Sequence, residues 1–228
     1  MITLALDTST RTGGCAVLRG ADLLADVAGE PARSHAERLP GDLMTVLERA
    51  RLALSDVDVF AVATGPGSFT GLRVGIATMQ GLSLAAARPL VGVSVFDALA
   101  TSAAAATEAR VATWVDAWRG EVYAALFDGV REIESASVEL PDAILARLRG
   151  TPTLFIGDGA AVHGERIRRA MGPHGEFAPV LDPPLAGIIG RLARAEVEAG
   201  RRPGAADIQP LYVRRPAPEL TREARVER

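Results

Sequence analysis

Residues 57–75 read VDVFAVATGPGSFTGLRVG and contain the transition that decides the fold. The run Val57–Ala63 is almost continuously apolar, as expected for a strand buried on both faces within a parallel sheet. A glycine-rich turn follows it, and the segment Gly71–Ala87 then has helical periodicity. Leu90–Val93 repeats the buried-strand signal after this helix. Strand, helix and parallel strand in this order predict an α/β protein.

The residues before this stretch complete one half of the molecule. Three short apolar runs separated by turn residues predict a meander of strands over Ile2–Asp7, Cys15–Leu18 and Leu23–Val27. Ser34 and Glu37 stand at capping-box spacing, and apolar residues recur behind them at helical period, which predicts a helix over residues 34–54. A short helix from about Phe96 then closes the order βββαβαβα.

The same order of elements recurs in the second half. Strands are predicted over Val111–Val115, Val122–Phe127, Val130–Ile133, Thr153–Ile156 and Phe177–Val180, and helices over Pro141–Leu148, Val162–Met171 and Leu185–Ala199. An aspartate ends the first strand of each half, Asp7 and Asp116. This duplication predicts two domains, residues 1–105 and 106–214, joined by a hinge near Ala100–Ala109. The tail 215–228, rich in Pro, Glu and Arg, is expected to be disordered.

Composition excludes several classes of function. All 25 basic residues are Arg, which excludes lysine Schiff bases and a P-loop lysine. A formal charge of -3 argues against a protein that binds nucleic acid alone, although a partner can still hold the nucleic acid. The single cysteine, Cys15, excludes an internal disulfide. With neither a signal peptide nor a membrane span in view, we expect a cytoplasmic protein without membrane association.

Two loops are candidates for binding a ligand. Gly65 and Gly67 permit positive φ, and the helix that follows them offers free N–H groups to an anion. The run Asp7-Thr8-Ser9-Thr10 places a carboxylate and three hydroxyls at the end of the first strand, where phosphate oxygens and, with Asp116, a magnesium ion can be held. Both loops also fit a plainer interpretation, in which they only form tight turns and satisfy turn backbone.

Other catalytic constellations are missing from the sequence. The three histidines are scattered and do not form a ligand pair, so we expect no metal site. The nucleophile-elbow pattern is absent and no Ser/His/Asp arrangement is visible, which argues against a protease. The helix over 71–87 carries several glycines, which indicates that another backbone approaches it closely. That backbone belongs either to the chain's own sheet or to a helix of another subunit.

In combination these motifs resemble the TsaB (YeaZ) family, the dimerization subunit of the bacterial tRNA threonylcarbamoyladenosine machinery. The stretches that carry the resemblance are Leu4–Thr10, Ser34–Leu39, Gly65–Gly75, Asp116-Ala117 with Gly120–Tyr123, Gly157–Gly159 and Pro210–Arg214. The resemblance implies an actin-like ATPase fold, in which two duplicated βββαβαβα domains flank a nucleotide cleft. This implication agrees with the duplication of elements described above.

The resemblance also implies a function. The family member is a non-catalytic partner of a larger paralogue, TsaD, and is required for N6-threonylcarbamoylation of adenosine 37 in tRNAs that read codons beginning with A. TsaD binds its metal through a His-x-x-x-His pair, and the corresponding positions here are Val95 and Leu99, which offer no lone pair. We therefore expect no catalytic residue in this chain. The family's Asp-Ala-Arg run reads Asp116-Ala117-Trp118-Arg119 here, so that Arg119 stands one position late.

Partners and cofactors follow from the same resemblance. It implies a heterodimer with TsaD, association with the ATPase TsaE, contact with tRNA through the complex, and a homodimer when the chain is alone. The expected interface lies on the helices over 34–54 and 71–87, at Leu39, Leu43, Leu47, Gly71, Gly75, Thr78, Met79 and Leu82. No cofactor is assigned, and ATP or ADP with Mg at the complex interface stays open. The alternative function is an ATP-dependent phosphotransferase that uses Asp7 or Asp116 near magnesium.

Overall fold

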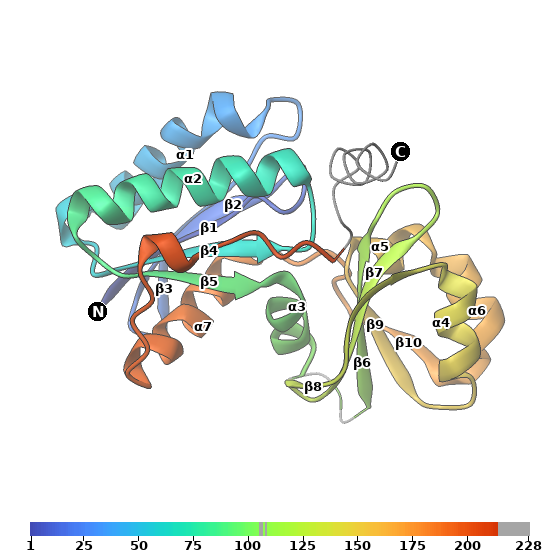
Figure 1. Cartoon of the computed structure of the whole chain (residues 1–228). Helices are drawn as coiled ribbons and strands as arrows, with labels where there is room; N and C mark the ends of the chain where they lie inside the picture. The colour runs from blue at the N-terminus through green and yellow to red at the C-terminus, as the bar shows by residue number, and fades with distance from the viewer. Residues whose placement is uncertain (105–106, 108, 214–228) are drawn as a thin grey trace, which may run out of the picture.

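The chain folds into two five-stranded sheets with helices packed on their faces (Figure 1). The structure, a computed structural model, describes residues 1–104, 107 and 109–213. The predicted disordered tail and residues 105, 106 and 108 of the predicted hinge lie outside this described part. Within it, none of the helices combines the length and the apolar character needed to cross a membrane.

The first sheet consists of an antiparallel meander extended by two parallel strands. Its order is β3-β2-β1-β4-β5, from β1 (Ile2–Asp7), β2 (Gly14–Arg19), β3 (Asp22–Ala28), β4 (Val59–Gly65) and β5 (Leu90–Ser94). β1 pairs antiparallel with β2 and parallel with β4, and β4 pairs parallel with β5. Helices cover both faces of the sheet, which explains why β4 is apolar along almost its whole length.

Two helices cover one face of this sheet: α1 (His35–Ala50) and α2 (Phe69–Ala86). The Glu37 carboxylate accepts hydrogen bonds from the backbone N–H and the hydroxyl of Ser34, as the predicted capping spacing requires. The predicted helix over 34–54 is wrong at its end, because Arg51 takes the left-handed conformation and caps α1. Residues Leu54–Asp56 form a separate 3-10 turn.

The second sheet repeats the topology of the first. Its order is β10-β9-β6-β7-β8, from β6 (Arg110–Asp116), β7 (Val122–Asp128), β8 (Arg131–Glu139), β9 (Thr153–Ile156) and β10 (Gly175–Phe177). α4 (Pro141–Leu148) and α6 (Gly164–Met171) pack on one face, and the short α5 (Asp158–Val162) follows β9. Each sheet thus consists of a three-stranded meander with two parallel strands added beside its first strand, β1 or β6. This repeat confirms the predicted duplicated α/β fold.

The predicted domain range 106–214 needs a correction. α7 (Ala186–Glu198) comes after the second sheet in the chain but packs on β1, β2, β4 and β5 of the first sheet. A Cβ on Gly190 would collide with Leu18 and lie 3.3 Å from the Ala5 Cβ, so that this close approach depends on glycine. The segment after α7 also returns to the first domain, where the Leu211 N–H donates to the Thr64 carbonyl at 2.8 Å.

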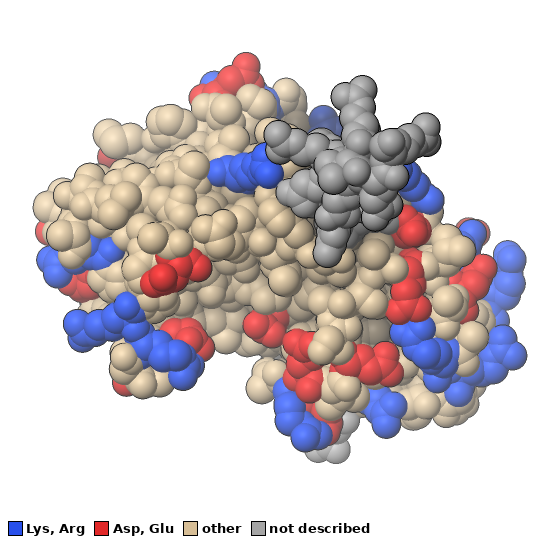
Figure 2. All heavy atoms as spheres, viewed as in Figure 1, with Lys and Arg blue, Asp and Glu red and all other residues tan. Residues whose placement is uncertain are grey.

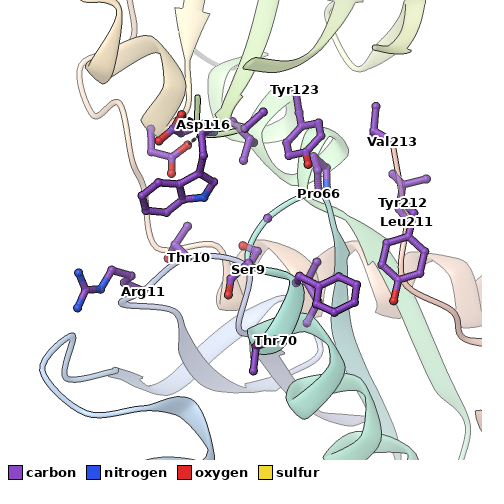
Figure 3. Close-up of a pocket in the computed structure, with 18 of the residues that line it drawn as sticks. Ser9, Thr10, Arg11, Pro66, Thr70, Asp116, Tyr123, Leu211, Tyr212 and Val213 are labelled. Carbon is purple, nitrogen blue, oxygen red and sulfur yellow. Dashed lines mark hydrogen bonds between the residues drawn. The ribbon is translucent and has the colours of Figure 1, made fainter. Parts of the chain in front are cut away.

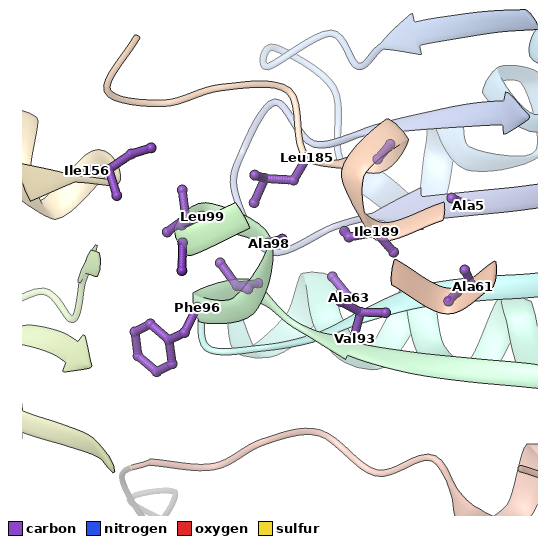
Figure 4. Close-up of a cluster of buried hydrophobic side chains, with 14 of the residues drawn as sticks. Ala5, Ala61, Ala63, Val93, Phe96, Ala98, Leu99, Ile156, Leu185 and Ile189 are labelled. Atoms are coloured by element: carbon purple, nitrogen blue, oxygen red, sulfur yellow. The ribbon is translucent and has the colours of Figure 1, made fainter. Parts of the chain in front are cut away.

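One hydrophobic cluster connects the two domains (Figure 4). α3 (Val95–Ala104) lies between the sheets and contributes Phe96 and Leu99, which are buried. The first sheet and α7 reach this cluster from one side with residues such as Ala61 and Ile189, and the second sheet reaches it with Ile156. The two domains therefore share a core, and the cleft described next lies where the ends of β1, β4, β6 and β9 meet.

Candidate functional site

A cleft of about 700 Å³ lies between the two domains (Figure 3). Its first-domain wall consists of the loop after β1 and the turn between β4 and α2. Its second-domain wall consists of the β6–β7 hairpin and the residues after β9. Residues 211–213 line a third side. Its volume falls within the range of roughly 300–1,000 Å³ that is usual for small-molecule sites.

The run Asp7-Thr8-Ser9-Thr10 divides between the cleft and the core behind it. Ser9 and Thr10 line the cleft. Asp7 and Thr8 are buried behind them, and the Asp7 carboxylate accepts the Ser9 backbone N–H at 2.8 Å. Burial raises the pKa of Asp7, although the hydrogen bonds from Ser9 oppose this shift. The Asp7 carboxylate thus caps a turn, which the plainer interpretation also predicts.

Two residues at the start of α1 hold the loop after β1 in place. The His35 imidazole Nε2 lies 2.9 Å from the Thr10 carbonyl oxygen, and its Nδ1 lies 2.8 Å from the Arg38 guanidinium. Arg38 is buried, donates to the Thr12 carbonyl and forms an ion pair with Asp42 at 2.6 Å. Because the Thr10 carbonyl accepts from Nε2–H and Arg38 donates to Nδ1, these contacts fit a neutral ring. Burial and the Arg38 charge accordingly lower the pKa of His35.

The glycine-rich turn packs directly on this loop. Gly65 and Gly67 both have positive φ, 113° and 155°. A Cβ on Gly67 would collide with the Ser9 carbonyl, and the Ser68 N–H donates to that same carbonyl at 2.7 Å. Gly67 lines the cleft, whereas Gly65 lies behind it against Leu72. Ser68 caps α2 by accepting the Gly71 N–H at 3.2 Å, so the N-terminus of α2 opens into the cleft.

Carboxylates line the opposite wall. The Asp158 carboxylate accepts the Asp116 N–H at 2.9 Å, and the Asp116 carboxylate accepts the Trp118 N–H at 3.0 Å. Asp182 faces the same space, where burial and the neighbouring charges of Asp158 and Asp7 raise its pKa to about 6. The sequence prediction found Asp116 but missed Asp158 and Asp182, because only the fold brings their loops to this wall.

Hydroxyl groups and carboxylates both line this site, and the carboxylates already accept backbone N–H groups. Asp7, Asp116 and Asp158 each accept a backbone N–H, so part of their coordinating capacity is occupied. No group of three or more His, Cys, Asp or Glu side chains in the described residues is arranged to hold a metal ion. The Ser9 hydroxyl lines the cleft beside the Asp7 carboxylate, and hydroxyl groups suit phosphate oxygens.

The positions that correspond to the paralogue's metal pair point into the core. Val95 and Leu99 lie one turn apart on α3 and are 1% and 2% exposed. Both belong to the cluster that joins the two domains. Their side chains stabilise the junction of the domains by burial.

The predicted interface residues need a correction. Six of them are buried within the chain itself, because the apolar stripes of α1 and α2 cover the first sheet: Leu39, Leu43, Leu47, Gly71, Gly75 and Met79. Thr78 and Leu82 are half-buried. A Cβ on Gly71 would collide with the Thr8 carbonyl, and one on Gly75 with the Thr8 hydroxyl, so these glycines serve the chain's own packing. Gly81 has open space around it.

Some exposed residues of the same helices are uncharged and are here called the α1–α2 face, whereas Glu48, Arg49 and Arg73 are exposed on the same two helices. It consists of Pro40, Gly41 and Met44 on α1 and Ala77, Gly81, Leu84 and Ala85 on α2. Met44 is 61% and Leu84 72% exposed. Figure 2 shows that the surface over α2 is largely uncharged.

An aromatic rim that the sequence did not predict borders the cleft. The rings of Phe69 and Tyr212 lie 5.7 Å apart, and the Arg73 guanidinium lies 4.0 Å above Phe69 and donates to the Tyr212 hydroxyl at 2.9 Å. Trp118 lines the cleft from the β6–β7 hairpin and is 67% exposed. One signal for this rim is present in the sequence, because a tryptophan directly follows Asp116-Ala117. A tryptophan that is exposed at this position does not pack in the core.

Comparison with known proteins identifies the family. Residues 27–165 match the family model "TsaD: tRNA N6-adenosine threonylcarbamoyltransferase". The chain is 30% identical over 225 residues to the tRNA threonylcarbamoyladenosine biosynthesis protein TsaB of Haemophilus influenzae, covering 92% of both chains. The structure of YeaZ from Pseudomonas aeruginosa superposes with a TM-score of 0.77 at 33% identity, over 93% of this chain and 100% of that one.

More distant structures share the fold alone. An activator of 2-hydroxyisocaproyl-CoA dehydratase from Clostridium difficile matches with a TM-score of 0.55 at 10% identity, over 88% of this chain and 97% of that one. The fold is thus the one found in actin-like ATPases and sugar kinases. Sequence identity over nearly the whole length and a shared structure lead to one conclusion: the chain belongs to the TsaB (YeaZ) family.

Proposed function

We propose that this chain takes part in tRNA threonylcarbamoyladenosine biosynthesis as a non-catalytic subunit that binds a TsaD paralogue. The observation that carries the proposal is the 30% identity to a TsaB protein over 92% of both chains. Val95 and Leu99 support the non-catalytic role, because two buried aliphatic side chains cannot bind a metal ion. The modified atom would be N6 of adenosine 37, in tRNAs that read codons beginning with A.

The α1–α2 face is the surface proposed to bind the paralogue. It carries two large exposed apolar side chains, Met44 and Leu84, on helices that contact each other. The small residues Ala77 and Gly81, exposed on α2, allow another helix to approach closely. Apolar side chains that lose contact with water at the centre of an interface contribute most of its stability. The same face would pair two copies of this chain when the paralogue is absent.

The test is association with the cognate TsaD protein, measured by size exclusion and by calorimetry. We expect the double variant Met44→Glu/Leu84→Glu to bind at least about tenfold more weakly, because two carboxylates would have to be desolvated. Leu140→Glu is the matched control, since Leu140 is 58% exposed but lies at the start of α4 in the second domain. Threonylcarbamoyladenosine formation in a reconstituted reaction should fall with the double variant and persist with the control. Equal binding by both variants would reject the α1–α2 face.

We further propose that the assembly is cytoplasmic, that it includes the ATPase TsaE, and that this chain contacts tRNA through the complex. The formal charge of -3 supports contact with RNA through the partner, since phosphate binding needs clustered positive charge. The decisive experiment is to reconstitute threonylcarbamoyladenosine formation without this chain. Modification that proceeds at the same rate would overturn the proposed role.

The alternative, an ATP-dependent phosphotransferase, finds less support in the cleft. Asp7 would have to serve magnesium, but it is buried behind Ser9 and accepts the Ser9 N–H. Burial also raises the pKa of Asp7, which disfavours the ionised form that a metal ion requires. Tight binding of Mg-ATP that Asp7→Ala abolishes would favour the alternative.

A further inference from the structure

Residues 211–213 bring the chain to the cleft directly before residues 214–228, which lie outside the described part of the structure. The Leu211 N–H bond to the Thr64 carbonyl fixes this approach, and Val213 lines the cleft itself. Figure 3 shows Val213 on one side of the cleft and Asp116 on the other. A segment that begins at residue 214 is therefore tethered at the cleft.

The first residues of this segment, 214–218, read Arg-Arg-Pro-Ala-Pro. They carry two positive charges and no acidic residue. A proline disfavours helical backbone at the residue before it, so Pro216 and Pro218 favour an extended stretch. In polyproline II geometry, at about 3.1 Å per residue, five residues span about 16 Å. That length exceeds the width of a compact cavity of about 700 Å³, so the segment is long enough to cross the cleft.

The second-domain wall of the cleft offers acceptors for arginine. Asp116 and Asp158 line it, and neither forms an ion pair with a described residue. The Asp116 carboxylate accepts the Trp118 N–H at Oδ1, which leaves its second oxygen for a further donor. Arg11 and Arg119 also line the cleft, but both side chains are exposed. An arginine that reaches this wall forms charge-assisted hydrogen bonds, which are roughly twice as strong as neutral ones.

The aromatic side chains at the cleft suit the prolines. Trp118 is 67% exposed, and Trp118 and Arg119 both have left-handed backbone, with φ of 60° and 57°. Left-handed backbone at two consecutive non-glycine residues is unfavourable, and such conformations concentrate at functional sites. Phe69 and Tyr212 line the same cleft and are 41% and 38% exposed. Proline-rich segments dock in aromatic-lined grooves at a low entropic cost, because their extended conformation is already restricted.

We propose that residues 214–218 bind in this cleft within the same chain, with the two guanidinium groups paired with Asp116 and Asp158 and the prolines packed on Trp118. The tether at Val213 favours this occupant over a separate peptide, because a short tether gives an effective concentration in the millimolar range. The bound segment restricts access to the cleft, so that a ligand of the cleft has to displace it. This inference goes beyond the proposed docking role and does not depend on it.

The first experiment measures how well the segment shields Trp118 in the full chain. Of the two tryptophans, Trp114 is fully buried, so the neutral quencher acrylamide reaches mainly Trp118. We expect quenching to increase in the double variant Arg214→Glu/Arg215→Glu, because the wall carboxylates repel the two new negative charges. A neutral quencher is needed, since the variant changes the charge of the chain.

Two further variants separate the proposed contact from a general effect of charge. Arg222→Glu/Arg225→Glu is the matched control, because it makes the same change of charge later in the sequence. Its quenching should equal that of the unchanged chain. Asp116→Asn should increase quenching as Arg214→Glu/Arg215→Glu does, since asparagine keeps an acceptor for the neighbouring backbone N–H but loses the negative charge.

The second experiment adds the peptide Arg-Arg-Pro-Ala-Pro in trans and measures its binding by calorimetry. Arg214→Glu/Arg215→Glu leaves the cleft free, whereas in the unchanged chain the tethered segment competes with the peptide. We expect the double variant to bind the peptide at least about tenfold more tightly than the unchanged chain, because the competitor acts at a millimolar effective concentration.

Three results would overturn the proposal. The first is equal quenching in the unchanged chain and in Arg214→Glu/Arg215→Glu. The second is peptide binding that is equally tight in both chains or undetectable in the double variant. The third is shielding of Trp118 that increases with protein concentration, which would show that a second copy supplies the segment. Circular dichroism of each variant separates a lost contact from a lost fold. The paralogue is absent from these measurements, so a negative result leaves the docking proposal to its own test.

Discussion

Among single residues, two glycines of α2 have opposite surroundings although they look equivalent in the sequence. Gly75 faces the stiff, buried side chain of Thr8, whereas Gly81 faces open space. We expect Gly75→Ala to lower the free energy of unfolding by about 1–3 kcal/mol through overpacking. Gly81→Ala should raise it by about 0.5–1 kcal/mol, because alanine favours the helix. Urea denaturation measures both, and shifts of the same sign would contradict the assigned packing.

The pH dependence of stability can be assigned to one carboxyl group at the cleft. The pKa of Asp182 is raised from 3.8 to about 6 by burial, Asp158 and Asp7. Between these values the folded state binds more protons than the unfolded state, so this group reduces stability as the pH rises through about 6. Asp182→Asn should therefore raise the Tm at pH 7.5, and the gain should shrink below about pH 6. A gain that is constant from pH 5 to 8 would show that charge repulsion is not its cause.

For whole elements, the sequence predicts most of the type and order correctly and fails on what each element packs against. The apolar period of α1 correctly identifies a stripe with Leu39, Leu43 and Leu47, but periodicity does not say whether a stripe covers the chain's own sheet or a partner. For the same reason the sequence predicts α7 in the second domain, next to it in the chain, although α7 packs on the first sheet. The docking residues therefore had to be found from exposure, which depends on the whole fold.

The same limit applies to the candidate site. Local motifs predict four of its residues, because turn chemistry is visible in a few adjacent positions: Ser9, Thr10, Gly67 and Asp116. Asp182 belongs to no local pattern, and Tyr212, although it lies in the matched stretch Pro210–Arg214, reaches the cleft only because the chain returns to the first domain after α7.

The segment between α7 and Val213 is an element that propensity alone would not reveal. Ile208 is buried against the first domain, and the Gln80 side chain donates to the carbonyls of Ala205 and Ile208 at 2.8 and 3.1 Å. We expect Ile208→Ala to destabilise the chain by about 2–4 kcal/mol. Tyr212→Ala, at a residue 38% exposed, should cost less than about 1 kcal/mol. Denaturation that fails to distinguish the two variants would show that this segment does not anchor to the first domain.

At the scale of the whole molecule, the cluster around α3 makes the two domains one folding unit. Residues of both sheets pack on Phe96 and Leu99, and α7 returns from the second half of the chain to the first sheet. Neither domain can lose its structure without exposing apolar surface of the other, so we expect a single cooperative unfolding transition. Both tryptophans lie on the second-domain side, Trp114 in β6 and Trp118 in the hairpin after it. Tryptophan fluorescence therefore reports that domain, while far-ultraviolet circular dichroism reports both.

Leu99→Ala tests this coupling, because Leu99 is 2% exposed and lies beside the Gly157 turn of the second domain. The variant should lose about 2–5 kcal/mol, the range for a leucine removed from a core. If the cluster couples the domains, the fluorescence and circular dichroism transitions should move together to lower urea concentration. Leu145→Ala is the matched control, since Leu145 is equally buried but packs only within the second domain. A fluorescence transition that separates from the circular dichroism transition in Leu99→Ala would show that the domains unfold independently and that the cleft between them can open without unfolding either wall.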